Sequence, residues 1–305
     1  QVGAESDWRT ANSESMKSTF SEKNGYKLIF DDAQQKQENQ LTAIRNFIQQ
    51  EVDYIVLAPV TETGWDTVLQ EAKDAGIPVI IVDRMVDVKD DSLYTAWVGS
   101  NFELEGKKAA AYLDAYMKAK NMKDMKLVNI QGTIGASAQI GRTKGLDDAV
   151  AANGWNLLDK TTGEFTQAKG QEVMQSFLKK YKKDINVVYC ENDNEAFGAI
   201  DAIKAAGYEV GADKDMMVFS FDSTKEGLKK VQSGEITLNT ECNPLHGPRV
   251  EAIIKQLENK ETPEKKAYVD EEMFAHDDTV KSVTVDGKEY PVTVVTDEVM
   301  GARKY

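Results

Sequence analysis

Short apolar runs alternate with helical stripes along the first hundred residues. The segments 52–59 (VDYIVLAP) and 79–82 (VIIV) are rich in β-branched residues and nearly continuous in apolar character. Such runs are typical of strands that are buried on both faces of a parallel sheet. The residues between them show the i, i+3, i+4, i+7 spacing of an amphipathic helix at Trp65, Val68, Leu69 and Ala72. The three segments predict a β-α-β unit.

The same alternation continues on both sides of this unit. Residues 27–30 predict an earlier strand, and residues 126–130, 186–190 and 216–221 predict later ones, with helical stretches between them. This alternation is typical of parallel sheets with helices on their faces. The chain is therefore expected to be an α/β protein. Its 305 residues exceed the size of most single cores, which favours two domains.

Further elements are predicted near the two ends of the chain. A helical stretch is expected over about residues 10–23 with no strand before it, although a central first strand is usual in such a fold. Helical spacing of apolar residues predicts a helix over 248–257. The segments 282–285 and 292–295 flank the two-residue turn signal Asp286–Gly287 and predict a β-hairpin.

The charge of the chain excludes some classes of partner. Lys and Arg number 37 against 51 Asp and Glu, which gives a formal charge of −14. Such a surface repels nucleic acid and anionic membranes, so neither is expected as a partner. No run approaches the roughly 20 apolar residues that span a bilayer. No dinucleotide, P-loop or nucleophile-elbow motif is present, so no cofactor and no catalytic group are predicted.

The two cysteines do not form a metal or redox motif. Cys190 and Cys242 are far apart in sequence, and His246 and His276 are the only histidines that could join them. The cysteines fit either a single disulfide or two small buried apolar residues. No metal ion is predicted.

Polar side chains follow two of the predicted strands. Asp83 and Asp222 each end an apolar run, and the segments that lead to them, AKDAGIPVIIVD and AIKAAGYEV followed by MMVFSFD, echo each other. Ligands of open α/β sheets bind beyond the carboxyl ends of the strands. Two lobes that face one another across those ends would direct Asp83 and Asp222 into one cleft from opposite walls.

The residue types near these strand ends suit a polyol. Carboxylates, guanidinium groups and amides can each pair with two adjacent sugar hydroxyls, and Arg84, Arg142 and Asn192 add such groups. A sugar ring also packs its C–H groups on flat apolar faces, which Trp8 and Phe165 could supply from loop-like contexts. The pattern therefore favours a carbohydrate site.

Each of these residues also has an ordinary structural interpretation. Asp83–Arg84 fits a surface ion pair or a capping loop, Arg142 fits a solvated helix start, and Trp8 fits core packing. Asn192 and Asp222 fit helix caps, which Asn and Asp often form after strands. Taken singly, none of them identifies a sugar site.

Taken in order, segments from nearly the whole chain resemble the type I periplasmic sugar-binding proteins of ABC transporters, the ribose-binding family, and within it the galactofuranose-binding subfamily. Several motifs in the correct order are far more specific than any one of them. The matching segments are QVGAESDWR, DDAQQKQENQ, APV and TGW within 58–65, IPVIIVDR, IQGTIGAS, GEFTQAKGQEVMQSF and ENDNEAFGAIDAIKAAG.

The resemblance implies a set of ligand contacts. Trp8 would stack on the sugar, Asp83 and Arg84 would contact it from one lobe, and Phe165 would supply a second aromatic face. Asp7 stands where the subfamily has Gly, and no calcium-binding loop is present, so the resemblance leaves the sugar open and implies no metal. The implied contacts are Glu5, Ser6, Asp7, Trp8, Arg9, Asp83, Arg84, Arg142, Phe165, Asn192, Asp222 and Glu241.

The resemblance also implies two Rossmann-like, doubly wound parallel-sheet lobes that are joined by a three-strand hinge. Residues 1–102 and 243–276 would form the N-terminal lobe, and residues 103–242 and 277–305 would form the C-terminal lobe. The ligand would lie in the cleft between them.

The implied function is to capture a monosaccharide by hinge closure and deliver it to a membrane permease. The sugar would be a galactofuranose-like furanose or a related pentose or hexose. Such a protein would be an exported monomer, periplasmic or on the outer face of the cytoplasmic membrane, with or without a lipid anchor. Two alternatives stay open: the effector-binding domain of a sugar-responsive transcriptional regulator, and a sugar-modifying enzyme.

Overall fold

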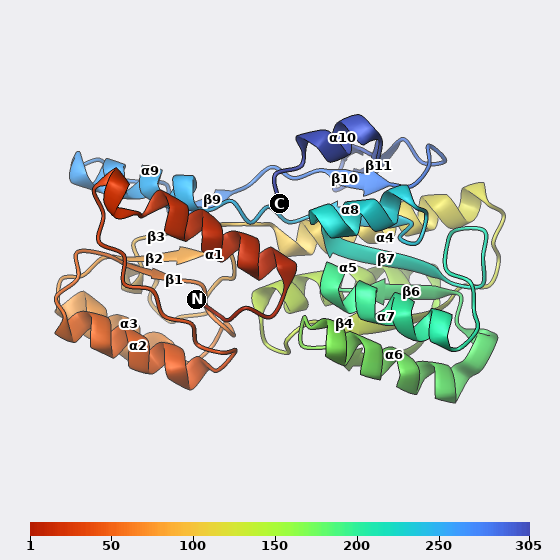
Figure 1. The fold of residues 1–305 in the computed structure, drawn as a ribbon, viewed down its shortest axis with the longest axis horizontal. Helices are drawn as coiled ribbons and strands as arrows, with labels where there is room; N and C mark the ends of the chain where they lie inside the picture. Colours follow the sequence, from red (N-terminus) through yellow and green to blue (C-terminus); the bar gives the residue numbers. More distant parts are fainter. The chain divides into compact units, whose positions relative to one another are not determined.

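The computed structural model describes residues 1–305 and divides them into two compact units (Figure 1). Apart from residues 135–137, which group with the first unit, the chain leaves that unit after Ser100, returns after Cys242 and leaves again after Asp270. Unit 1 comprises residues 1–100, 135–137 and 243–270. Unit 2 comprises residues 101–134, 138–242 and 271–305.

Unit 1 contains a parallel sheet of four strands in the order β1-β2-β3-β9. The strands are β1 (Ile55–Leu57), β2 (Val79–Val82), β3 (Ala96–Gly99) and β9 (Lys266–Tyr268). The helices are α1 (Asp7–Thr19), α2 (Gln37–Gln49), α3 (Asp66–Asp74) and α9 (Gly247–Glu258), with short 3₁₀ turns η1 (Glu22–Asn24) and η2 (Asp91–Leu93).

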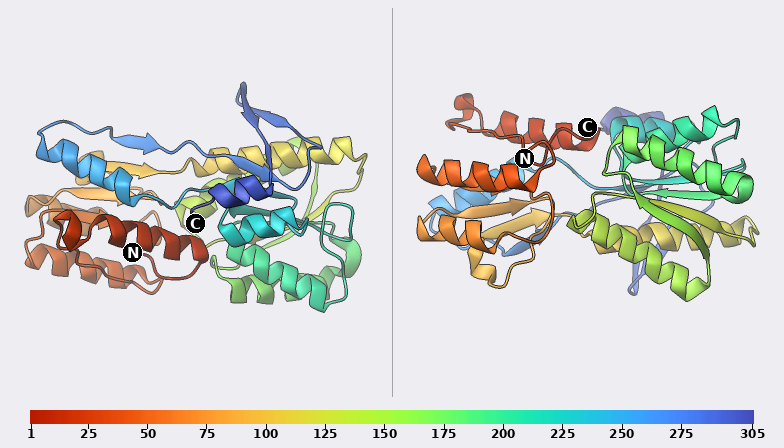
Figure 2. Two further views of the ribbon diagram at one scale, coloured as in Figure 1. Left: turned by 45° about the horizontal axis from the view of Figure 1, so that its top comes forward. Right: turned by 90° about the horizontal axis from the view of Figure 1, so that it is seen from below.

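Helices cover both faces of this sheet (Figures 1 and 2), and apolar core residues fill the space on each face. Because successive strand residues point to opposite faces, Ile55 and Ile81 pack with α2 and α3, whereas Ile80 and Val82 pack with α1 and α9. Burial on both faces explains why the strands are continuous apolar runs.

Unit 2 contains a sheet of seven strands in the order β13-β10-β8-β7-β6-β4-β5. The five neighbouring strands β5, β4, β6, β7 and β8 are parallel to one another. Strand β10 is antiparallel to β8, and β13 is parallel to β10. The strands are β4 (Lys126–Gln131), β5 (Asn156–Thr162), β6 (Val187–Cys190), β7 (Met217–Asp222), β8 (Leu238–Glu241), β10 (Met273–Ala275) and β13 (Thr293–Val294). The helices are α4 (Phe102–Ala119), α5 (Ser137–Asn153), α6 (Gln167–Tyr181), α7 (Asp193–Ala205), α8 (Lys225–Gln232) and α10 (Asp297–Ala302), with the 3₁₀ turn η3 (Lys182–Asp184).

Two apolar clusters cover the two faces of this sheet. Helices α6, α7 and α8 pack on one face, where they meet Val128 and Val188. Helices α4 and α5 pack on the other, with Leu127, Tyr189 and Phe219. The predicted α/β class is confirmed, and β1, β2, β4, β6 and β7 lie where the apolar runs predicted strands.

The strand predicted at residues 27–30 is wrong. These residues belong to no strand, and Leu28, Ile29 and Phe30 are each about two-fifths exposed. The reason is that β1 is the edge of its sheet and pairs with β2 alone. No strand therefore lies beside residues 27–30 to bind their backbone groups.

The hairpin near the C-terminus is confirmed, but its second strand was placed too late. Strand β11 (Ser282–Val285) pairs with β12 (Lys288–Pro291) and not with residues 292–295. Both turn residues, Asp286 and Gly287, have positive φ, so the two-residue turn fixes the register and the strand resumes at once. Figure 2 shows this hairpin projecting from unit 2.

Two other features bear on the sequence predictions. The last crossing of the chain from unit 1 to unit 2 falls between Asp270 and Glu271, whereas the resemblance placed it near His276. The crossing comes earlier because β10 pairs with β8 in the sheet of unit 2. Cys190 and Cys242 are both buried free thiols, which agrees with the interpretation as small apolar residues and not with a disulfide.

Helices α4 and α5 approach each other closely through glycines. A Cβ atom on Gly145 would lie 2.3 Å from the carbonyl carbon of Gly106, and one on Gly141 would lie 2.6 Å from the backbone nitrogen of Glu103. Arg142 lies on α5 between the two glycines. The glycines therefore set how near Arg142 comes to α4.

We expect Gly145→Ala to destabilise unit 2 by about 1–3 kcal/mol, because the added methyl group overlaps the backbone of α4. Gly301→Ala is the matched control, since nothing lies near a Cβ atom there and helix propensity favours Ala by up to about 1 kcal/mol. Chemical denaturation of both variants tests this. Equal stability of the two variants would show that α4 and α5 can separate without cost.

Candidate functional site

The first candidate site lies at the carboxyl end of β2 in unit 1 and consists of Glu5, Trp8, Arg9, Asp83 and Arg84. The Ser6 hydroxyl caps α1 by accepting from the backbone N–H of Arg9 at 3.1 Å. This cap places Trp8 and Arg9 in the first helical turn. Asp83 follows β2 directly and has a φ of 65°. We call this group the unit 1 site.

Arg9 is the centre of the unit 1 site. Its Nη2 lies 2.8 Å from Oδ2 of Asp83, and its Nε lies 3.0 Å from Oε1 of Glu5. Burial acts to lower the pKa of Arg9, but the charges of Asp83 and Glu5 outweigh it and raise this pKa. Arg84 lies 3.7 Å from the same Glu5 oxygen and donates to the carbonyl of Val60 at 3.0 Å. Two guanidinium groups and two carboxylates thus balance in charge.

The unit 1 site contains a buried acceptor and a buried aromatic ring. Oε2 of Glu5 is buried and accepts no hydrogen bond from the protein. Such an oxygen is suited to accept a hydrogen bond from a ligand hydroxyl. The ring of Trp8 is buried, with the guanidinium of Arg9 4.7 Å above its centroid. Asp7, by contrast, is exposed in the first turn of α1.

His246 contacts Trp8. The sequence suggested no role for His246 other than as a possible metal ligand. Its ring makes an edge contact with Trp8 at 6.3 Å between centroids. The ring is fully buried, and neither of its nitrogens has a hydrogen-bond partner. Burial lowers the pKa of His246 from 6.5 to about 3, and the charges of Arg249 and Arg9 act in the same direction. His246 is therefore neutral at physiological pH.

The second candidate site lies at the carboxyl ends of β5, β6 and β7 in unit 2 and consists of Arg142, Phe165, Asn192 and Asp222. We call this group the unit 2 site. Arg142, from the first half of α5, lies 2.7 Å through Nε from Oε2 of Glu105 and 3.1 Å through Nη2 from Oδ1 of Asp222. It is buried and also donates to the carbonyl of Glu191. Like Arg9, it lies between two carboxyl groups.

Asp222 is the last residue of β7 and has a φ of 95°. Burial raises its pKa to about 8, although the neighbouring charge of Arg142 acts to lower it. Asp222 therefore holds its proton more strongly than an exposed aspartate does, and burial also raises the pKa of Glu105 on the other side of Arg142. The unit 2 site, like the unit 1 site, carries little net charge.

Phe165 and Asn192 hold each other in place. Oδ1 of Asn192 accepts from the backbone N–H of Glu195 at 2.8 Å and caps α7, while its amide donates to the carbonyl of Phe165 at 3.0 Å. Phe165 has a φ of 62°, and its ring covers Gly132, where a Cβ atom would lie 2.0 Å from Cζ. The capping role that the sequence allowed for Asn192 is thus present.

Glu241 is engaged within unit 2 at both carboxylate oxygens. Oε1 accepts from Arg303 at 2.9 Å and from the Tyr305 hydroxyl at 2.7 Å. Oε2 accepts from the backbone N–H of Glu272 at 2.9 Å. These contacts give Glu241 a structural role.

Sequence reasoning missed a layer of buried carboxyl groups beneath the unit 2 site. Glu191 accepts from Asn129 and from the backbone of Gly132, and burial raises its pKa to about 7 although these bonds act to lower it. Asp193 accepts from Ser220, Thr224 and Asn239. The run ENDNE at 191–195 was the available signal, because it directly follows a buried strand.

One group could in principle hold a metal ion. Ligand atoms of Glu105, Cys242 and Glu271 lie within 4.8 Å of one another. Arg142 already binds Glu105, Lys108 donates to the backbone of Glu271, and burial raises the pKa of the Cys242 thiol. The group thus already holds two cationic side chains and a protonated thiol, which does not fit a cation site.

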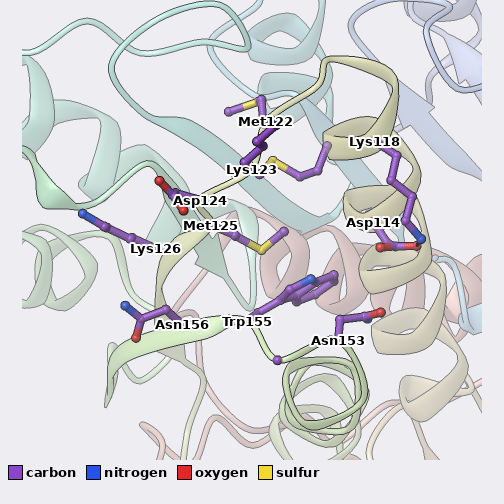
Figure 3. Close-up of a pocket in the computed structure, with 12 residues that line it drawn as sticks. Asp114, Lys118, Met122, Lys123, Asp124, Met125, Lys126, Asn153, Trp155 and Asn156 are labelled. Atoms are coloured by element: carbon purple, nitrogen blue, oxygen red, sulfur yellow. Dashed lines mark hydrogen bonds and ion pairs between the residues drawn. The ribbon is translucent and has the colours of Figure 1, made fainter.

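A separate pocket of about 380 Å³ lies at the amino ends of β4 and β5, opposite the strand ends that carry the unit 2 site. Figure 3 shows Met125 beside the indole of Trp155, with lysines and aspartates around them. Buried polar groups do not converge there as they do at the two sites.

Comparisons with known proteins identify the family of this chain. Residues 2–242 match the family described as periplasmic binding protein domain. The chain is 44% identical over 269 residues to the galactofuranose-binding protein YtfQ of Escherichia coli, covering 87% of this chain and 83% of that protein.

Two solved structures are similar throughout. One, from Mycobacterium smegmatis, is a complex with β-D-fucofuranose, with a TM-score of 0.86, 40% identity and coverage of 92% of this chain and 90% of that one. The other is the periplasmic binding component of the arabinose ABC transporter from Shewanella sp. ANA-3, bound to α- and β-L-arabinofuranose. It has a TM-score of 0.84, 41% identity and coverage of 92% and 91%.

We expect unit 1 to lose stability in acid through His246. Its folded pKa of about 3 lies below its ordinary 6.5, so the unfolded chain takes up the proton first. The contribution of the neutral His246 ring to the free energy of unfolding is complete above pH 6.5, and it falls by about 1.4 kcal/mol per pH unit below that pH. The variant His246→Leu removes the unpaired ring, so its free energy of unfolding at pH 7 should be close to that of the unsubstituted protein. Between pH 7 and pH 5 the variant should lose about 2 kcal/mol less of that free energy than the unsubstituted protein does.

Urea unfolding followed by tryptophan fluorescence measures this difference, because Trp8, Trp65 and Trp97 all lie in unit 1. The comparison at pH 8 sets the baseline, since His246 is uncharged there in both states. Parallel pH profiles for His246→Leu and the unsubstituted protein would contradict the assignment.

Proposed function

Since this chain belongs to the periplasmic binding protein domain family, we propose that it is the binding component of an ABC importer and captures a monosaccharide in its furanose form. The proposal assigns it a binding role and no chemical step. The similar proteins reported above carry the names of sugar-binding proteins or hold sugars.

The observation that carries the proposal is the pair of charge-balanced, buried arginine–carboxyl sites. In unit 1, Arg9 and Arg84 balance Glu5 and Asp83. A neutral ligand that donates and accepts many hydrogen bonds fits such a site better than an anion or a cation does. Each site also holds a buried aromatic ring, Trp8 or Phe165, for the apolar face of a sugar.

We assign the furanose form from the similar proteins. Galactofuranose, fucofuranose and arabinofuranose are named for three of them, and all three sugars have five-membered rings. In our proposal the unit 1 site and the unit 2 site bind the same sugar molecule, and the chain crossings between the units act as a hinge.

The proposed partners follow from the same family. A membrane permease would receive the sugar from this protein outside the cytoplasmic membrane, where the protein would act as a monomer without nucleic acid. None of its helices has the length and apolar character needed to cross a bilayer.

A thermal-shift screen tests the proposal. We expect D-galactose, D-fucose or L-arabinose to raise the melting temperature, because a ligand at 100 times its Kd adds about 2.7 kcal/mol of stability. Methyl furanosides should raise it more than the matching methyl pyranosides. If no monosaccharide in either ring form shifts the transition, the sugar proposal is wrong.

Substitutions at the two strand ends test the assigned residues. Asp83→Asn and Asp222→Ala should each weaken binding of the active sugar by at least about tenfold, because a buried hydrogen-bonding partner is lost. Asp159→Asn is the control, since Asp159 is a partly exposed carboxylate in β5 that pairs with Lys180. Calorimetric titration gives the Kd values, and unchanged Kd values in both site variants would place the ligand elsewhere.

A further inference from the structure

Arg303 binds the strand end that carries Asp222, and Tyr305 binds Arg303 and the neighbouring Glu241. Nε of Arg303 donates to the carbonyl oxygen of Ser223 at 2.7 Å, and Nη1 donates to Oε1 of Glu241 at 2.9 Å. The Tyr305 hydroxyl donates to the same Glu241 oxygen at 2.7 Å and accepts from Nη2 of Arg303. We call Arg303, Tyr305 and Glu241 the C-terminal anchor.

The turn held by this anchor has an unfavourable backbone conformation. Asp222 has a φ of 95° and Ser223 a φ of 53°, so two consecutive residues other than glycine lie in the left-handed region. Such residues cost about 1–3 kcal/mol each and persist only where the surroundings hold them. The side chain of Asp222 depends on this turn for its position.

The surroundings hold Ser223 from two sides. Oδ1 of Asn239 accepts from both the backbone N–H and the hydroxyl of Ser223, at 2.9 and 3.0 Å. Arg303 binds the carbonyl of the same residue. Asn239 lies on β8 within the sheet, whereas Arg303 follows α10, near the C-terminal end of the chain.

The side chains of the C-terminal anchor are buried and held by several contacts. The side chains of Arg303 and Glu241 are 9% and 7% exposed, and Glu241 lies directly opposite Asp222 in the pairing of β7 with β8. Since Glu272 occupies the other oxygen of Glu241, that carboxylate cannot turn away from Arg303 without losing a bond. The guanidinium of Arg303 also lies 5.2 Å over the ring of Phe274.

From these contacts we propose that Arg303 is a positioning residue that sets sugar affinity by holding the Asp222–Ser223 turn, with Tyr305 and Glu241 holding Arg303. The ligand in this proposal rests on the proposed function, but the hold on the turn does not. A residue outside the ligand contacts thus determines how well Asp222 meets the sugar.

Two measurements on Arg303→Gln test the proposal. The amides of Ser223 and Thr224 donate to Asn239 and Asp193, so hydrogen exchange in a peptide over 217–224 reports on the turn. We expect this exchange to rise. Titration with D-galactose and L-arabinose should show a Kd about tenfold weaker, because the hydrogen bond from Arg303 to Ser223 and the ion pair that fixes Arg303 to Glu241 are lost.

A double-mutant comparison separates positioning from general destabilisation. If Arg303 acts through Asp222, then Arg303→Gln should weaken binding little further in the Asp222→Ala background. Arg303→Lys should recover only part of the affinity, because one ammonium group cannot repeat the fork that joins Ser223 to Glu241. Tyr305→Phe should weaken binding in the same direction, because Tyr305 holds Arg303. Tyr116→Phe is its control, since it removes a similar tyrosine–carboxylate bond, to Asp277, elsewhere in unit 2.

The outcomes are distinct. Faster exchange at 217–224 with non-additive loss of affinity supports the proposal. Unchanged exchange in Arg303→Gln overturns it, as does an affinity loss that adds fully to that of Asp222→Ala. If the unsubstituted protein binds neither sugar, the proposed function fails for these ligands, and the exchange measurement alone decides whether Arg303 holds the turn.

Discussion

A buried guanidinium between two carboxyl groups is the interaction on which both candidate sites depend. Arg9 in unit 1 and Arg142 in unit 2 each bind a strand-end aspartate and a second carboxyl group. Moving such a charge out of water costs several kcal/mol, and only close partners offset that cost. The arginine and the aspartate of each unit therefore constrain each other, and neither side chain can be placed without the other.

The same constraint explains the backbone at the strand ends. Asp83 and Asp222 both have positive φ, although neither is a glycine. In each case the chain turns sharply as it leaves the strand, which brings the carboxyl group towards the arginine. Strain of this kind is kept where surrounding contacts over-determine it. The close glycine packing of α4 and α5 belongs to the same system, because it sets the position of Arg142.

Much of this arrangement was predictable from the sequence, for physical reasons. Strands buried on both faces are continuous apolar runs, so the residues that directly follow them, such as Asp83 and Asp222, could be selected. Glu105 could not be, because a glutamate in the first turn of a helix is ordinarily a solvated residue. Residues 27–30 resembled a strand in composition, but a strand needs a neighbour, and pairing is not visible in a local pattern. The resemblance implied a ligand contact for Glu241 and gave no sign of its contacts with Arg303 and Tyr305, which lie more than sixty residues away in the sequence.

The balance of charge also bears on why such a site would hold a ligand without reacting with it. A general base needs a carboxylate with a free oxygen near the proton it removes. Asp83 is held by Arg9, and Asp222, whose pKa burial raises to about 8, keeps its proton near pH 7. Neither group is therefore poised to take a proton from a sugar hydroxyl at neutral pH. Groups that are fixed, paired and near neutrality can bind many hydroxyls, and they leave the bonds of the sugar intact.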